Sequence, residues 1–230
     1  MYIYGKNSVM ESLKKKEEIK KVFLSSHFHE PEIQKLLNNQ NVHIVDKNKL
    51  DQMVKGNHQG IIVEVKDYEY ASLEELLEEN AFLVILDHLE DPHNFGAIIR
   101  TCEAAGVTGI IIPKDRSVDV TSTVVRVSVG AISNVKIAQV TNLVNTMKYL
   151  KEKGFWIVGT DMNGTPYSKI DYKGNLALVI GNEGKGMSSL VEKNCDFIAS
   201  IPMNGTINSL NASVAAGIII FEAVKNRNEL

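Results

Sequence analysis

The 230-residue sequence contains little cysteine and little arginine, and these shortages exclude several classes of protein. Cys102 and Cys195 are its two cysteines, and neither belongs to a Cys-x-x-Cys or Cys/His cluster. We therefore expect no disulfide scaffold and no structural zinc site, and we predict that both thiols are buried. None of the six histidines has the spacing of a helical metalloprotease motif, so we predict no metal ion.

Long apolar runs are also missing. No segment approaches the ~20 apolar residues that a membrane-spanning helix needs. The first residues lack the charged-then-apolar plan of a secretion signal. The sequence therefore predicts a soluble cytoplasmic protein with no membrane partner.

The charge balance argues against a protein that coats nucleic acid by bulk electrostatics, because the formal net charge is -3. DNA is accordingly not expected as a partner. Three of the four arginines, however, fall in one stretch, at Arg100, Arg116 and Arg126. Because arginine suits bidentate phosphate contacts, this clustering indicates a phosphate-rich ligand.

Strand-like and helix-like patterns alternate along the chain, which predicts an α/β fold. Residues 1–70 resemble a small α/β module. Ser72 and Glu75 form a capping-box pattern that predicts a short acidic helix over residues 72–80, within a linker at 71–80. Residues 81–230 alternate so regularly that we expect a mostly parallel sheet covered on both faces.

The expected strands lie at 21–25, 42–45, 60–65, 82–86, 109–112, 135–140, 155–160, 175–180 and 197–201. The expected helices, besides 72–80, lie at 7–15, 32–37, 49–54, 94–105, 121–127, 142–153, 188–193 and 210–225.

Three polar, glycine-containing segments each follow an apolar, strand-like run. They are Asp91–Arg100, Leu178–Met187 and Ile201–Asn211. Open α/β sheets form their ligand crevices at strand ends, so a ligand site is expected where these segments meet. The glycines of the second segment match neither the Walker phosphate loop nor the dinucleotide-binding pattern.

Each segment also has a purely structural interpretation. Asn94 could be a helix N-cap, Arg100 could pair with Glu103 one turn away, and Ser209 could cap the last helix. Capping does not readily explain why Asn204, Asn208 and Asn211 crowd one loop, because a buried amide needs a partner. The residues alone leave both interpretations open.

The order and spacing of three motifs resemble those of the SpoU/TrmH family of RNA ribose 2'-O-methyltransferases, in the knotted SPOUT class. The matching residues are Asn94, Gly96 and Arg100 in the first motif, Gly181, Glu183, Gly184 and Gly186 in the second, and Ser209, Leu210 and Asn211 in the third. The resemblance implies a SPOUT methyltransferase domain over residues 81–230 with a deep trefoil knot. It also implies a homodimer formed through that domain.

The same resemblance implies S-adenosylmethionine as cofactor and RNA as substrate. The implied cofactor-binding residues are Gly159, Thr160, Gly181, Ile201 and Leu210. The implied catalytic residues are Arg100, Asn94, Glu183, Ser209 and Asn211. Because an arginine side chain stays protonated in proteins, we expect Arg100 to hold a phosphate and stabilise alkoxide charge, with Glu183 as an alternative proton acceptor.

Two amino-terminal stretches, Tyr4–Leu13 and His58–Val65, resemble the L30e-like substrate-binding domain of the RlmB group. That group methylates a guanosine ribose in large-subunit (23S) rRNA. A tRNA ribose methyltransferase and a non-catalytic RNA-binding or ribosome-assembly factor on the same scaffold are the alternatives.

Overall fold

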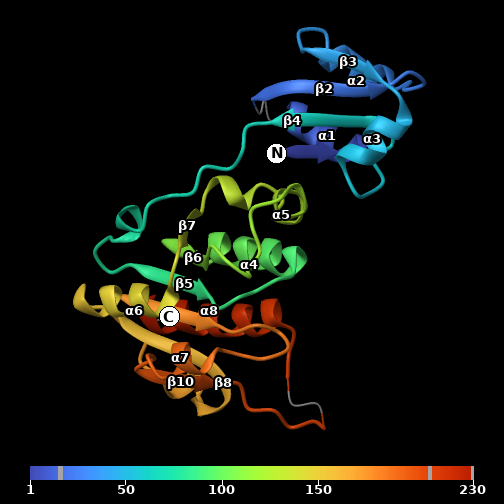
Figure 1. Cartoon of the computed structure of the whole chain (residues 1–230). Helices are drawn as coiled ribbons and strands as arrows, with labels where there is room; N and C mark the ends of the chain where they lie inside the picture. Colours follow the sequence, from blue (N-terminus) through green and yellow to red (C-terminus); the bar gives the residue numbers. More distant parts are fainter. Residues whose placement is uncertain (15–17, 207–208, 229–230) are drawn as a thin grey trace. The chain divides into compact units, whose positions relative to one another are not determined.

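The computed structural model describes residues 1–14, 18–206 and 209–228, and the chain forms two compact units (Figure 1). The first unit is Met1–Glu69 and the second is Tyr70–Leu230. Within the described ranges, no helix is both long and apolar enough to cross a bilayer.

The first unit contains a mixed four-stranded sheet with the order β1-β4-β2-β3. Its strands are β1 (Tyr2–Tyr4), β2 (Ile19–Ser25), β3 (Val42–Val45) and β4 (Ile61–Val65), and its helices are α1 (Lys6–Lys14), α2 (Pro31–Leu36) and α3 (Lys47–Met53). Strand β4 is antiparallel to both β1 and β2, whereas β2 and β3 are parallel. The sequence did not predict β1, because three residues are too few to display an alternating pattern.

Helices cover the two faces of this sheet unequally. Residues of α1 and α2, including Val9 and Ile33, form one buried cluster with Val22 and Val63 of the sheet. On the other face, α3 and the residue that follows it contribute Leu50 and Val54 to a small cluster with Ile62. The second face is therefore only partly covered.

The second unit is built on a six-stranded, entirely parallel sheet with the order β10-β8-β9-β5-β6-β7, which confirms the predicted parallel α/β arrangement. Its strands are β5 (Phe82–Leu86), β6 (Gly109–Pro113), β7 (Lys136–Val140), β8 (Trp156–Pro166), β9 (Leu176–Ile180) and β10 (Phe197–Ser200). Its helices are α4 (Pro92–Ala104), α5 (Ser122–Val127), α6 (Leu143–Glu152), α7 (Ser189–Glu192) and α8 (Ala212–Asn228), with 3-10 turns η1 (Glu74–Leu76), η2 (Ala131–Ser133) and η3 (Tyr167–Lys169).

The core of this unit lies on both sides of the sheet. Every residue of β5, β6 and β9 is buried, as expected for parallel strands with two covered faces. On one side α6 and α7 contribute Met147, Leu150 and Val191 to a cluster with strand residues. On the other side α4 and α8 pack against each other (Figure 1).

The predicted helix over residues 72–80 is wrong in length, because only the turn η1 forms. Ser72 donates from both its amide and its hydroxyl to Glu75 Oε2, at 2.7 and 2.8 Å, and these bonds lower the pKa of Glu75. A longer helix would place Glu78 and Glu79 in its last turn, where the helix dipole disfavours acidic groups. Glu78 instead pairs with Lys136 at 3.0 Å.

Two other sequence predictions need adjustment. Strand β8 extends to Pro166, well beyond the predicted end at Thr160. Cys102 is buried as predicted, but Cys195 is only partly buried, and both thiols are free. Burial raises the pKa of Cys195 to about 12.

The end of α8 is fastened to the rest of the unit by Arg227. Its Nη1 donates to the carbonyl oxygens of Tyr172, at 3.1 Å, and of Gly174, and its Nη2 donates to the Asn80 carbonyl. The guanidinium also lies over the Phe82 ring, 5.4 Å from its centroid. Partial burial lowers the pKa of Arg227. One side chain thus joins α8 to two segments distant in sequence.

We expect Arg227→Ala to lower the free energy of unfolding by about 1–3 kcal/mol, because carbonyl groups lose charged hydrogen-bond donors. Urea denaturation followed by circular dichroism measures this. Lys225→Ala is the matched control, since Lys225 lies in the same turn and makes only a 3.7 Å surface pair with Glu222. Equal stability of the two variants would contradict the fastening role.

Candidate active site

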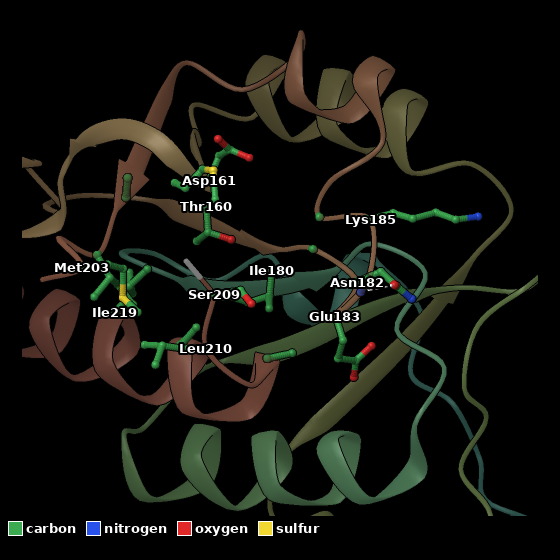
Figure 2. A pocket seen from close by; sticks show the side chains of 18 residues that line it. Thr160, Asp161, Ile180, Asn182, Glu183, Lys185, Met203, Ser209, Leu210 and Ile219 are labelled. Atoms are coloured by element: carbon green, nitrogen blue, oxygen red, sulfur yellow. Dashed lines mark hydrogen bonds between the residues drawn. The ribbon is translucent and has the colours of Figure 1, made fainter. Parts of the chain in front are cut away.

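A pocket of about 410 Å³ lies where β8, β9 and β10 meet the start of α8 (Figure 2). Its apolar wall includes Ile180, Ala199, Ile201, Met203, Leu210 and Ile219. Its polar lining includes Thr160, Asp161, Asn182, Glu183 and Ser209. The volume lies within the ordinary range of small-molecule sites, about 300–1,000 Å³.

The loop after β9 is a tight, self-bonded turn. Asn182 and Gly186 exchange two backbone hydrogen bonds of 3.0 and 2.9 Å. The Asn182 side chain accepts from the Gly184 amide at 2.9 Å and donates to the His88 carbonyl at 2.8 Å. Gly186 has φ +66°, a left-handed conformation that favours glycine. The glycines therefore shape a fixed turn.

The far end of this loop is held by Asp87, which directly follows β5 and is 1% exposed. Asp87 Oδ2 accepts from the Ser188 amide at 2.6 Å, and the Asp87 amide donates to the Ile180 carbonyl at 2.8 Å. Asp87, at the end of β5, thereby positions the loop that follows the neighbouring strand β9.

Three motif side chains form one hydrogen-bonded chain beside the pocket. Asn94 Nδ2 donates to Glu183 Oε1 at 2.6 Å, and Asn94 Oδ1 accepts from Asn211 Nδ2 at 2.9 Å. Figure 2 shows the Glu183 carboxylate pointing into the space between α8 and α4. Since Asn94 is only 8% exposed, both ends of its amide are committed to these partners.

The structure assigns the helix caps differently from the sequence. Asp91 caps α4, accepting from the amides of His93 and Asn94 at 3.0 and 3.3 Å, so Asn94 is not the N-cap. Asn211, not Ser209, caps α8: its Oδ1 accepts from the amides of Ser213 and Val214. Gly106 follows the end of α4 with φ +67°, the left-handed conformation typical of a glycine at a helix C-terminus.

Most predicted site residues come together. Thr160, Gly181, Glu183, Ile201, Ser209 and Leu210 line the pocket. Asn94 and Asn211 adjoin it through the hydrogen-bonded chain. Gly159 lies behind the lining, where an added Cβ would come within 2.7 Å of Cys195 Sγ. Asn204 is exposed, and Asn208 lies outside the described residues.

Arg100 is the predicted residue that does not join the pocket. It is exposed on α4 and makes no hydrogen bond or ion pair with any residue that the structure describes. The alternative role of Arg100 as a surface partner of Glu103 is not observed, because Glu103 instead accepts from Asn134 Nδ2 at 3.1 Å. Gly96, one turn earlier, faces α5, and an added Cβ there would meet Val127 at 2.6 Å.

Sequence reasoning missed several residues of the site. Asp161 and Met203 line the pocket, whereas Asp87 and Asn182 hold its loop. The signal for Asp87 and Asp161 was present, because each directly follows an apolar run predicted as a strand. Asn182 and Met203 lay inside the recognised segments, but no pattern distinguished their roles.

The charged residues of the pocket lining are two acidic residues and one basic residue. Asp161 and Glu183 contribute carboxylates, while the Lys185 side chain extends away from the cavity (Figure 2). Across the described ranges, no group of three or more His, Cys, Asp or Glu side chains is placed to hold a metal ion. The combination of apolar wall, amides and carboxylates suits an organic ligand with positive charge better than a phosphate.

Comparison with known proteins points to the same family that the three motifs resemble. Residues 81–221 match the SpoU rRNA Methylase family, and residues 2–71 match the family described as RNA 2'-O ribose methyltransferase substrate binding. This chain belongs to the SpoU rRNA methylase family.

A relative in Bacillus subtilis (strain 168), YacO, is provisionally named a TrmH-family tRNA/rRNA methyltransferase. It is 45% identical over 99% of this chain and 96% of its own length. The AdoMet-bound rRNA methyltransferase of Sinorhizobium meliloti has a TM-score of 0.74 and 28% identity, over 96% of this chain and 85% of that chain. The SpoU methyltransferase AviRb of Streptomyces viridochromogenes, at 24% identity and a TM-score of 0.77 over 100% of this chain and 91% of that chain, shares the fold.

The tight turn in this SpoU-family pocket predicts a sharp contrast between two glycines. A Cβ at Gly181 would lie 2.4 Å from the Gly186 carbonyl carbon, whereas one at Gly184 would meet only Asn182 Oδ1, at 3.6 Å. We expect Gly181→Ala to cost about 1–3 kcal/mol of unfolding free energy through overpacking, and Gly184→Ala to cost much less. Thermal unfolding of both variants tests this, and a smaller loss for Gly181→Ala than for Gly184→Ala would refute it.

Proposed function

We propose that this protein transfers a methyl group from S-adenosylmethionine to the ribose 2'-hydroxyl of a guanosine in large-subunit (23S) rRNA. Family membership makes the protein an S-adenosylmethionine-dependent RNA methyltransferase. The observation that carries the catalytic part is the chain Asn211–Asn94–Glu183 at the rim of an acidic, apolar-walled pocket.

The pocket residues fit the cofactor. S-adenosylmethionine carries a sulfonium and an ammonium group, and Asp161 and Glu183 contribute two carboxylates to the pocket lining. Ile201 and Leu210 offer apolar surface for a nucleoside, and Gly181 and Thr160 complete the lining. Thr160 Oγ1 already donates to the Val179 carbonyl at 3.0 Å, so its hydroxyl is fixed in place. When bound, the cofactor supplies the electrophilic methyl group.

Glu183 is proposed as the group that orients the target hydroxyl or accepts its proton. The Asn94 amide fixes one carboxylate oxygen, and Asn211 fixes the amide in turn. Because Asn211 also caps α8, the orientation of Glu183 depends on the position of that helix. Ser209, exposed at the pocket lining, adds a hydroxyl that can contact substrate.

Arg100 is proposed to bind the RNA phosphate beside the target ribose. Its exposure on α4 leaves the guanidinium available to a ligand outside the pocket. A side chain that stays protonated is suited to hold a phosphate and to stabilise alkoxide charge, and is poorly suited to remove a proton. Arg126, also exposed and on the helix packed against α4, adds positive charge to this region.

The first unit is proposed to be an L30e-like substrate-binding domain, as in the RlmB group. The two stretches that resemble this domain, Tyr4–Leu13 and His58–Val65, contact each other in the fold. The Lys6 amide donates to Gln59 Oε1 at 2.8 Å. Gln59 and Gly60 both have positive φ, so the second stretch begins with a special backbone turn. His58 supports that turn by accepting from the Gly60 amide at 2.9 Å.

We also propose a trefoil knot in the second unit and a homodimer formed through it. The chain leaves β10 at one edge of the sheet and returns as α8, which packs on α4 at the centre of the unit. We propose that the chain is threaded in this part of the unit. Val214 and Phe221, 50% and 49% exposed, lie two turns apart on one side of α8 and offer an apolar surface for a second copy.

The deciding experiment is to map 2'-O-methyl groups in ribosomal and transfer RNA from cells with and without this protein. We expect a single guanosine in the large-subunit RNA to lose its mark. Loss confined to tRNA would replace the rRNA assignment, which matters because YacO is named for both substrates. Unchanged methylation, together with no cofactor binding by calorimetry, would favour a non-catalytic RNA-binding or ribosome-assembly factor.

The phosphate-anchor role of Arg100 predicts that Arg100→Lys keeps the charge but loses the planar fork. Losing one charged hydrogen bond of about 1.5–3 kcal/mol corresponds to a drop in kcat/KM of about 10- to 150-fold. Methyl transfer to RNA measures this, and calorimetry should find cofactor affinity unchanged. Arg126→Lys is the matched control on the neighbouring helix; a fully active Arg100→Lys enzyme would rule out a bidentate anchor.

A further inference from the structure

The partly covered face of the first unit's sheet displays a row of three rings. Tyr2, Phe23 and His43 come from β1, β2 and β3. Phe23 and His43 stack with centroids 5.6 Å apart and an interplanar angle of 26°, and Tyr2 meets Phe23 edge-on at 6.3 Å and 85°. The rings therefore form one continuous surface across the sheet.

Strand register places these rings on a single face. Phe23 pairs with both Ile62 and His43, so these three side chains point the same way. Tyr2 pairs with Glu64, two residues along β4 from Ile62, and therefore shares that face. α3 packs on Ile62 and contacts Phe23, but it leaves the rest of the row open.

The open part of the row is accessible. Tyr2 is 36% exposed, His43 is exposed, and Phe23 is partly buried. Exposed aromatic rings on a sheet lose hydrophobic stabilisation unless something covers them. Their flat faces are matched by nucleobases, which stack on aromatic side chains regardless of sequence.

The charges beside the rings fit a nucleic-acid strand. Lys21 lies on the same face, since it pairs with Glu64, and it is exposed. Its ammonium makes no hydrogen bond or ion pair with the part of the chain that the structure describes, so it is available to a phosphate. Glu64, partly buried between Tyr2 and Lys21 in the register, can accept from the amino groups of a base.

We propose that Tyr2, Phe23 and His43 form a stacking surface for unpaired nucleobases of the RNA substrate, with Lys21 holding the adjacent phosphate. The proposal rests on the proposed function only in taking RNA as the substrate. The surface lies within residues 2–71, the segment that matches a substrate-binding family, but that match assigns no particular residue or face. Single-stranded RNA is preferred over duplex RNA because only unpaired bases can expose their faces to the rings.

The test uses the full-length protein without cofactor and a short single-stranded oligoribonucleotide that contains 2-aminopurine. Stacking on the rings should quench the fluorescence of that base, and the same sequence in a duplex should bind more weakly. We expect Tyr2→Leu/His43→Leu to weaken binding by about tenfold or more, because each base stacked on an aromatic ring contributes substantially to affinity. Tyr2→Phe/His43→Phe should retain binding, since it keeps the rings.

Ile44→Ala is the matched control, because Ile44 neighbours His43 on β3, points to the opposite face and is 64% exposed. Melting temperatures check that every variant is folded. No quenching by the wild-type protein, or equal binding by the Leu/Leu variant, would overturn the proposal. The assay measures RNA binding and needs no methyl transfer. Its result would therefore remain valid even if the proposed activity were absent.

Discussion

The short chain of hydrogen bonds from Asn211 through Asn94 to Glu183 is the constraint on which the site depends. It joins the starts of two helices, α8 and α4, to the loop that follows β9. Its partners are separated by 89 and 117 positions in sequence, so the contact exists only if the sheet order, both helix starts and the loop are correct. A small displacement of any one would leave a buried amide without a partner, which is costly.

Other residues hold the helices and the loop around this hydrogen-bonded chain in position. Asp91 takes over the capping of α4 and thereby leaves the Asn94 side chain free to bridge. Asp87 holds the far end of the loop, and Asn182 closes the loop on itself. Arg227 fastens the other end of α8. The polar groups beside the pocket are thus held by hydrogen bonds, while its apolar wall combines strand residues such as Ile180 with loop and α8 residues such as Met203 and Ile219.

The two units have structural features that suit different tasks. The second unit concentrates buried strands, an acidic pocket and a fixed carboxylate, which suit a chemical step. In the first unit, α3 covers only part of one sheet face, and aromatic rings lie on that face. Such a surface suits recognition of an RNA strand. A small molecule needs enclosure, whereas an RNA needs accessible surface.

The sequence by itself determined the alternation of strands and helices, the parallel sheet of the second unit and the two segments that line the pocket, with a third that adjoins it through Asn94. These follow from local periodicity and from polar residues placed directly after apolar runs. Tertiary structure decided that Asn94 bridges instead of capping, that Asn211 caps α8, and that Arg100 stays outside the pocket. Capping preference makes several neighbouring residues equivalent as candidates, and only the three-dimensional arrangement of distant partners selects among them.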